Sequence, residues 1–193
     1  MQIHTIGDSH SKKPWIYIKK YKINIHDIIS KRGPILMYSF GKDDLSRLNI
    51  KKIDSDIISQ FELQGYDKEI KDGDMLIFCF GEPDCRAHIY KQTIKTNKGY
   101  KNIIDEVVKN YFNAIKLNVE QFKNLKVVVN NIVPAVKKKE CRREDPTMPY
   151  LGTDNSRRDY VCYMNKKLKE YCYLYKYIFF DIHDKYSCKD GFL

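Results

Sequence analysis

The 193-residue sequence lacks several features that would place it in a class at once. No hydrophobic run reaches the ~18 residues that a membrane-spanning helix needs, and no basic-then-apolar leader of the kind that directs secretion stands at the N-terminus. There is no internal repeat and no low-complexity segment. We therefore expect a single domain over residues 1–193 of a cytoplasmic protein that has no membrane partner.

The six cysteines include no C-x-x-C pair, which is the spacing typical of zinc and redox sites. Cys79 lies within an apolar run, where a cysteine usually acts as a small buried hydrophobe. We expect reduced thiols, no metal site and no cofactor.

Positive charge is in excess, with a formal net charge of +10, while 42% of the residues are hydrophobic. The hydrophobic content excludes global disorder. The charge attracts anionic partners such as nucleic acid or acidic glycans, although a solvated lysine surface explains it as well. Nucleic acid is thus an alternative partner that the sequence does not favour, and the oligomeric state stays open.

Apolar runs alternate with helical patterns along the chain. Apolar residues at three- and four-residue spacing predict helices over 101–122 and 157–175, with a weaker one over Ser55–Gln64. Since strands that alternate with helices imply βαβ units, the predicted fold is α/β, a three-layer α/β/α, doubly wound and mostly parallel sheet of flavodoxin-like type. The predicted strands are Gln2–Ile6, Ile35–Phe40, Met75–Phe80, Lys126–Val133 and Tyr177–Asp181.

Two segments fit this pattern less well. Trp15–Ile18 and Ile23–Ile25 alternate like short edge strands, where most doubly wound folds have a first helix. Residues 134–149 predict a long basic loop, which is either functional or simply solvated.

The first strand leads directly into Gly7-Asp8-Ser9. Open α/β sheets keep their sites at the carboxyl ends of strands, and a tight turn there exposes a serine hydroxyl as a candidate nucleophile. The alternative is a plain turn in which Asp8 or Ser9 caps the next helix.

Two further strand ends carry residues suited to a site. The predicted strand at 35–40 ends at Gly41, where a backbone N–H can approach a ligand closely. The strand at 75–80 is followed by Glu82, Asp84, Arg86 and His88, which place carboxylates, a guanidinium and an imidazole within seven residues. The alternative for these is mutual ion pairing of Arg86 with Glu82 or Asp84.

Three ordered motifs carry a resemblance: Gly7-Asp-Ser-His10, the glycine-ended strand at Gly41, and Gly81-Glu-Pro-Asp-Cys-Arg86. Together they resemble the SGNH (GDSL-like) hydrolase superfamily, in particular a branch with Gly-Asp-Ser-His and Gly-Glu-x-Asp-Cys-Arg motifs. The resemblance extends to Ile178-Phe-Phe-Asp181 and Asp190-Gly191. It implies an α/β/α fold, Ser9 as nucleophile, and the backbone of Ser9 and Gly41 in the oxyanion hole.

The sequence departs from the superfamily in two places. Pro83 stands where the family usually has an asparagine that binds the oxyanion, and Arg86 or His88 would have to replace that donor. The Asp-x-x-His block that supplies the family's Asp and His is missing from the C-terminal quarter. Either the enzyme is impaired, a substitute base exists, or the sequence is a shortened form of a longer enzyme.

One substitute base follows the last predicted strand. His183 lies beside Asp181 and Asp184, either of which would orient its imidazole. The alternative is a surface histidine with a neighbouring ion pair. His10 is a poor base because adjacent side chains on a tight turn diverge, and we expect it either to line the pocket or to hydrogen-bond within the turn.

The resemblance and these residues favour a serine esterase or acyltransferase that acts on an ester, such as an O-acetyl group of a carbohydrate. The alternative is a catalytically impaired module that binds anionic glycan or nucleic acid. Neither the acyl group nor the acceptor follows from the sequence, and hydrolysis and transfer share the same acyl-enzyme.

Overall fold

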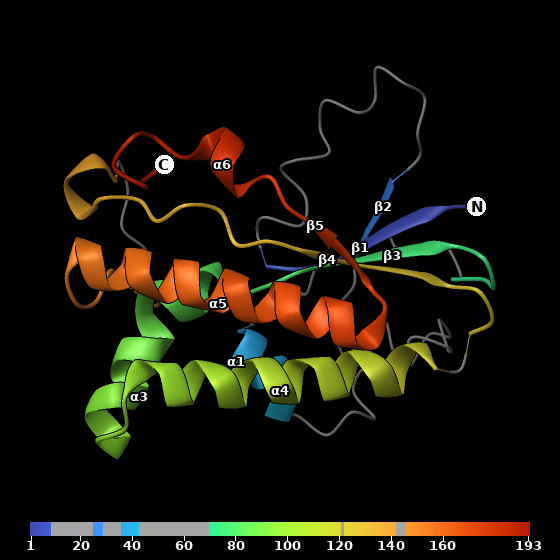
Figure 1. Ribbon diagram of the computed structural model, residues 1–193, viewed down its shortest axis with the longest axis horizontal. Helices are drawn as coiled ribbons and strands as arrows, with labels where there is room; N and C mark the ends of the chain where they lie inside the picture. The colour runs from blue at the N-terminus through green and yellow to red at the C-terminus, as the bar shows by residue number, and fades with distance from the viewer. Residues whose placement is uncertain (9–24, 29–35, 43–69, 121, 142–145) are drawn as a thin grey trace.

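A parallel five-stranded sheet organises the molecule (Figure 1). The computed structural model describes residues 1–8, 25–28, 36–42, 70–120, 122–141 and 146–193. All pairings are parallel and the strand order is β2-β1-β3-β4-β5, which is the flavodoxin-like order. The predicted α/β class is confirmed. The strands are β1 (Ile3–Gly7), β2 (Ile25–Ile28), β3 (Met75–Cys79), β4 (Lys126–Asn130) and β5 (Ile178–Phe180).

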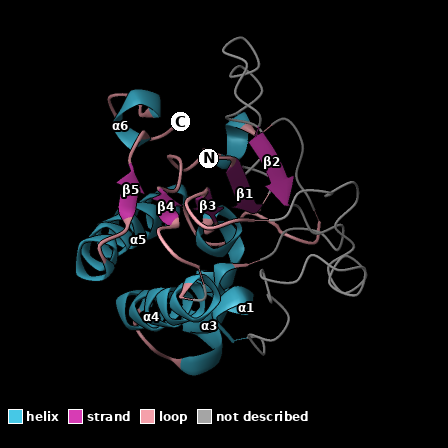
Figure 2. Ribbon diagram, turned by 90° about the vertical axis from the view of Figure 1, so that its right-hand side faces the viewer, coloured by secondary structure: helices cyan, strands magenta, loops and turns pink. Residues whose placement is uncertain are grey.

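Most of the described helices cover one face of this sheet. Figure 2 shows α1, α3, α4 and α5 below the strands and the short α6 on the opposite side, an arrangement that fits the predicted three-layer α/β/α architecture. The helices are α1 (Met37–Lys42), α3 (Ile89–Thr96), α4 (Tyr100–Val119), α5 (Asp154–Tyr175) and α6 (His183–Tyr186), with a π-helical segment at Asp84–His88 and a 3₁₀ turn at Lys138–Glu140.

The main core lies between the sheet and the helix layer. Alternate strand residues such as Leu76, Phe78 and Val129 point into it, where they meet the apolar stripe of α4, including Val108 and Phe112. The intervening strand residues Ile77, Cys79 and Val128 form a much smaller cluster on the other face. Burial on both faces explains why β3 reads as a continuous apolar run.

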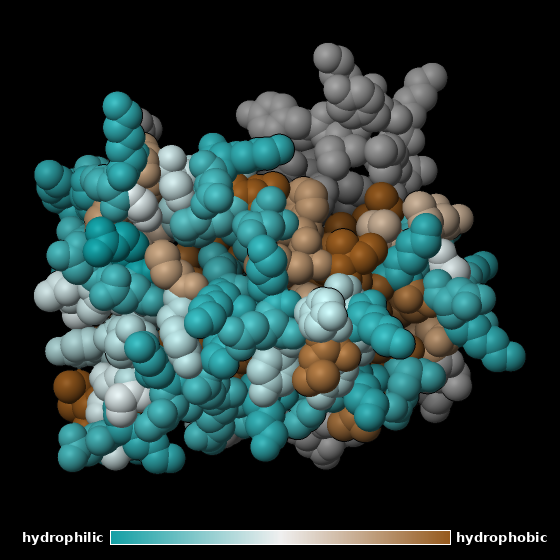
Figure 3. Space-filling model, viewed as in Figure 1, coloured by the Kyte–Doolittle hydropathy of each residue, from teal (hydrophilic) through white to brown (hydrophobic). Residues whose placement is uncertain are grey.

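The surface seen from the side of Figure 1 is mostly hydrophilic, with hydrophobic atoms gathered in the middle of the face (Figure 3). On β5, Ile178 and Phe180 are both exposed. None of the described helices is long and apolar enough to cross a membrane.

Most of the predicted elements are confirmed within a few residues of their ends: the strands at 2–6, 75–80, 126–133 and 177–181, and the helices at 101–122 and 157–175. Part of the predicted edge strand at Ile23–Ile25 is found as β2, which begins at Ile25. The predictions for Trp15–Ile18 and Ser55–Gln64 lie outside the described residues.

The strand predicted at Ile35–Phe40 is wrong, because residues 37–42 form helix α1. Met37 and Phe40 are both buried, and their spacing of three residues puts them on one helical face. The helix start is stabilised by Asp84, whose carboxylate accepts hydrogen bonds from the backbone N–H groups of Met37 and Tyr38. This contact spans more than 40 residues, so local pattern does not reveal it.

Gly41 consequently lies within a helix rather than at the end of a strand. A Cβ atom at this position would lie 2.9 Å from the backbone of Asn110 and Tyr111 in α4. The glycine therefore allows α1 and α4 to pack closely.

We predict that Gly41→Ala destabilises the protein by about 1–3 kcal/mol, because the new methyl group meets backbone atoms that cannot move aside. An exposed helical glycine would show the reverse, a gain of up to about 1 kcal/mol. Urea unfolding measures the difference. Lys109→Ala on the exposed face of α4 serves as control and should change stability by less than about 0.5 kcal/mol.

Candidate active site at the carboxyl ends of β1 and β3

The candidate site lies where the chain changes direction in the sheet. From β1 the chain passes to β2 on one side and later returns to β3 on the other, so β1 and β3 flank the topological switch point. Gly7 pairs with Cys79 at the ends of these strands, and the backbone N–H of Asp8 donates to the Cys79 carbonyl at 2.9 Å. The exit of β1 is thus held directly beside the exit of β3.

Two predicted site residues follow this point in the chain. Ser9 and His10 come directly after Asp8 and lie outside the described residues. Asp8 itself is buried. The peptide that carries the candidate nucleophile therefore begins at the switch point.

The exit of β3 turns sharply into a helix. Gly81 has a φ of +118°, which L side chains rarely adopt, and a Cβ there would lie 2.6 Å from the side chain of Ile132. The helix that follows is π-helical from Asp84 to His88, a form that is frequent at functional sites. The four predicted residues Glu82, Asp84, Arg86 and His88 all lie on this turn.

Asp84 is completely buried and faces α1. Its two carboxylate oxygens accept hydrogen bonds from the N–H groups of Met37 at 2.7 Å and Tyr38 at 3.1 Å. Burial raises the pKa of this carboxyl to about 7, and the negative charge of Asp8 raises it further. The hydrogen bonds from the two N–H groups act in the opposite direction and lower the pKa. Asp84 therefore caps a helix, which sequence reasoning had not assigned to it.

Glu82, Arg86 and His88 are partly exposed on the same turn. Arg86 Nε lies 3.4 Å from Glu82 Oε1, which is the ion pair that the sequence offered as an alternative role. The His88 ring lies 4.1 Å from the ring of Tyr38, between centroids. Helix α1 thus contacts the π-helical turn through the rings of Tyr38 and His88, and the same turn carries the Glu82–Arg86 ion pair.

Arg86 is further held by Tyr150, a residue that sequence reasoning missed. The Arg86 guanidinium lies 5.2 Å from the centre of the Tyr150 ring, and the guanidinium of Arg157 lies 5.2 Å from the same centre. The Tyr150 hydroxyl also hydrogen-bonds with Arg86 and Cys141, while burial raises its pKa. The N–H of Leu151 donates to the Arg86 carbonyl at 3.1 Å.

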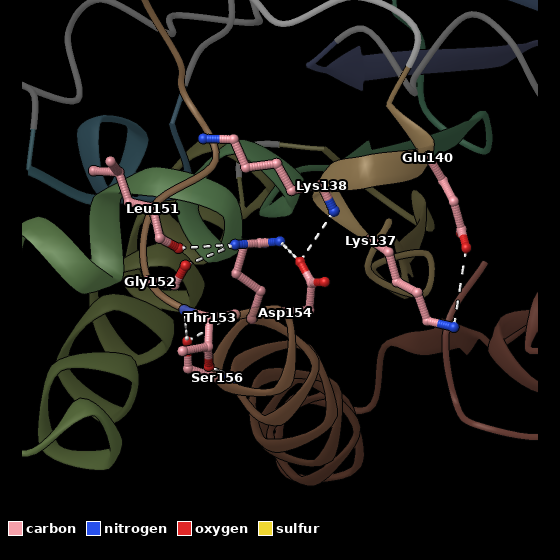
Figure 4. A network of polar contacts seen from close by, with 9 residues as sticks. Lys137, Lys138, Glu140, Leu151, Gly152, Thr153, Asp154 and Ser156 are labelled. Atoms are coloured by element: carbon pink, nitrogen blue, oxygen red, sulfur yellow. Dashed lines mark hydrogen bonds and ion pairs between the residues drawn. The ribbon is translucent and has the colours of Figure 1, made fainter.

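A polar network fixes the segment that carries Tyr150 (Figure 4). Arg157, only 2% exposed, donates to the carbonyls of Leu151 and Gly152 and pairs with Asp154. Asp154 also accepts from the Lys138 backbone at 3.0 Å. Thr153 and Ser156 form a capping box that starts α5. The basic loop predicted at 134–149 is therefore tied to the start of α5 at its described ends.

At the β4 and β5 exits, Asn131 positions the start of α6. Its backbone N–H donates to the Phe180 carbonyl, and its side-chain oxygen accepts from the N–H of Ile182 at 3.1 Å. The imidazole Nδ1 of His183 then lies 3.4 Å from Asp184 Oδ1 and 3.2 Å from Ser187 Oγ. Asp181 instead accepts from the backbone N–H of His183 at 3.1 Å.

The predicted site residues thus fall into two groups at one edge of the sheet. Glu82, Arg86 and His88 follow the β3 exit, where Glu82 pairs with Arg86 and His88 contacts Tyr38, whereas His183 follows β5. Strands β3 and β4 stand between β1 and β5. Two strand spacings of ~4.8 Å separate the ends of β3 and β5 by about 10 Å at the level of the sheet, and a third spacing separates the end of β1 from β5 by about 14 Å.

Gly41 does not lie at the end of a strand, where its backbone N–H was expected to help bind the oxyanion. Its place in the oxyanion hole rested on a strand end at that position, and it lies instead within α1 against α4. Among the residues that the structure describes, no group of three or more His, Cys, Asp or Glu side chains is arranged to hold a metal ion.

Comparison with known proteins gives a likeness of fold. No family model and no curated protein matches the chain. Among solved structures it is similar to BT4096, a gut microbial diltiazem-metabolizing enzyme, with a TM-score of 0.54 and 14% identity over 95% of this chain and 37% of that one.

A second solved structure, protein YXIM_BACsu from Bacillus subtilis, matches with a TM-score of 0.41 and 13% identity over 95% of this chain and 44% of that one. The chain therefore spans less than half the length of either structure. The likeness to the first establishes a shared α/β fold.

We predict that Asp84→Asn removes a pH dependence of stability. Between about pH 4 and pH 7 the folded protein holds a proton on Asp84 that the unfolded chain has lost. The free energy of unfolding of the wild type therefore falls as the pH rises through this range, by on the order of 1–4 kcal/mol. Urea unfolding at several pH values from 4 to 8 measures this slope. An equal slope in the variant would contradict the assignment.

We also predict that Arg157→Met costs about 2–4 kcal/mol, because it leaves the carbonyl groups of Leu151 and Gly152 without this donor and removes the ion-pair partner of Asp154. The neighbouring Arg158→Met is the matched control. Arg158 is about one-third exposed; it pairs with Asp159 at 3.6 Å, donates to the Asp190 carbonyl at 3.2 Å and lies 5.4 Å from the centre of the Phe192 ring. Because these contacts are exposed to solvent, its loss should cost about 1 kcal/mol, less than that of Arg157. Equal losses in the two variants would show that Arg157 is not special.

Proposed function

We propose that this chain is an SGNH-type serine esterase or acyltransferase that acts on an ester, with O-acetyl groups of carbohydrate as the substrate class. One observation carries the proposal: the Asp8 N–H to Cys79 carbonyl bond holds the exit of β1 at the switch point, one residue before Ser9. The motifs that resemble the superfamily follow the exits of β1 and β3, the two strands that flank this point.

In the proposed reaction the Ser9 hydroxyl attacks the ester carbonyl. The Oγ–C bond forms as the carbonyl π electrons move to oxygen, and the serine proton passes to a base. The alkoxide then leaves with that proton, and the acyl-enzyme remains. Water completes hydrolysis, whereas a sugar hydroxyl completes transfer.

The oxyanion needs donors at the same edge. The backbone N–H of Ser9 is the first of them. Arg86 is the second, because it follows β3, the strand paired with β1, and is held by Glu82 and Tyr150 while it stays partly exposed. It takes the place that the resemblance gave to Gly41 and to the asparagine that Pro83 replaces. The substrate side of the site is lined in this proposal by His10, Glu82 and His88. Asp84 is buried and does not contact the substrate; it stabilises the start of α1.

The base in this proposal is His183, oriented by Asp184 rather than by Asp181. It follows β5, the strand beyond β3 and β4, and the protonation of its ring is tested separately below. A small-molecule or glycan ester is the proposed partner. The name of the first solved neighbour, a drug-metabolizing enzyme, is compatible with such an activity.

We predict that a fluorophosphonate probe, which reacts with activated serines, labels the wild type and not Ser9→Ala. Turnover of a simple acetate ester should fall at least ~10³-fold in the variant, since removal of a nucleophile typically costs more than that. Intact-protein mass spectrometry measures labelling. Ser11→Ala removes a hydroxyl two residues away and should label like the wild type.

Equal labelling of wild type and Ser9→Ala would overturn the nucleophile assignment. Absence of labelling and turnover in the wild type would favour the alternative, an impaired module that uses its positive charge to bind anionic glycan or nucleic acid. Retention on a heparin column that falls with salt would then be the expected behaviour.

A further inference from the structure

We infer that Ser187 is a positioning residue for His183: it holds the imidazole proton on Nδ1 and leaves the lone pair of Nε2 to accept a proton. The inference rests on the proposed function for its catalytic meaning. The arrangement of His183, Asp184 and Ser187 lies wholly within described residues.

The hydrogen bonds of Ser187 determine which nitrogen of the His183 ring carries the proton. Its hydroxyl has one proton, and the His183 carbonyl at 3.1 Å can only accept, so the proton of Ser187 is directed there. The same Oγ lies 3.2 Å from His183 Nδ1 and has only lone pairs left to offer. A favourable contact therefore requires a proton on Nδ1.

Asp184 supplies a second acceptor at the same nitrogen. Its Oδ1 lies 3.4 Å from Nδ1, and the side chain is fully exposed to solvent. Two acceptors at Nδ1 favour the same tautomer. Asp181 does not contribute to this choice, because it accepts from the backbone N–H of His183.

The other nitrogen of the ring is in the state that a base needs. His183 Nε2 is buried and has no hydrogen-bond partner among the described residues. In the neutral ring with Nδ1 protonated, Nε2 carries the lone pair. This is the division of roles in a Ser-His-Asp triad, where an acceptor at Nδ1 keeps the histidine in its basic tautomer.

The segment around His183 is braced on both sides, so the ring is held in place. Before it, Ile182 donates to Asn131. After it, the Cys188 N–H donates to the Phe192 carbonyl at 2.7 Å, and the Leu193 N–H donates to the Ala135 carbonyl at 3.0 Å. Phe192 itself is buried in the main core. A preorganised base requires such support.

In the proposed reaction the proton moves from Ser9 Oγ to His183 Nε2 as the Oγ–C bond forms. The Nδ1 proton stays between His183, Asp184 and Ser187, and the imidazolium that forms is stabilised by both acceptors. The Nε2 proton is then given to the leaving alkoxide, which restores the neutral ring.

The test uses ¹⁵N-histidine NMR of the full chain, in which the ¹⁵N shifts of the ring distinguish protonated from unprotonated nitrogens. The sequence has five histidines, and His183→Asn identifies the signals of His183. In the neutral form of the ring we expect the proton on Nδ1. Ser187→Ala should increase the population protonated on Nε2, while Ser187→Thr, which keeps the hydroxyl, should restore the wild-type spectrum.

A wild-type ring protonated on Nε2, or no change in Ser187→Ala, would overturn the inference whatever the activity of the protein. In the labelling assay, Ser187→Ala should react about 10-fold or more slowly, with rescue by Ser187→Thr, since the tautomer of a catalytic histidine affects rate by up to ~10⁴. Full-rate labelling in Ser187→Ala would also overturn it. If the tautomer is as inferred but Ser9 never labels, the proposed function fails and the tautomer assignment stands.

Discussion

The carboxylate of Asp84, buried between the exit of β3 and the start of α1, is the contact on which the candidate site depends. A buried carboxylate is costly unless its oxygens are hydrogen-bonded, and here the N–H groups of Met37 and Tyr38 meet that need. In return, the carboxylate satisfies two N–H groups of the first turn of α1, which would otherwise lack partners. Through this contact Gly41 is set against α4 and Tyr38 against His88.

The second support of the candidate site comes from the segment that connects β4 to α5. The guanidinium groups of Arg86 and Arg157 both contact the ring of Tyr150, so a residue that follows β3 and one in the first turn of α5 share one aromatic ring. Arg86, Arg157 and Lys137 each have an acidic partner, namely Glu82, Asp154 and Asp190. These three basic side chains are therefore paired within the protein and hold its segments together. The net charge of +10 is a property of the whole sequence.

The periodic parts of the sequence predicted their structure well. The apolar run of β3 and the stripe of α4 depend on neighbours within a few residues, and burial of a whole face makes such patterns regular. The density of Glu82, Asp84, Arg86 and His88 after β3 pointed to the strand end at which we place the candidate site. The strand predicted at 35–40 failed because a short apolar run fits a strand as well as one turn of a buried helix. A carboxylate from far along the chain decided between them.

The sequence by itself determined the parallel α/β class, the order of most elements and the place of the candidate site, because periodicity and strand-end chemistry are local properties. Only the tertiary structure decided that Asp84 is a cap, that Tyr150 and Arg157 hold Arg86, and that Ser187 rather than Asp181 meets the ring of His183. These roles depend on which atoms the packed sheet and helices bring within reach. A hydrogen bond is selected by distance and direction in space. Asp84 and Met37, which are 47 positions apart, carry no trace of their contact in their spacing, and even the four-residue spacing of His183 and Ser187 shows it only once α6 is known to form.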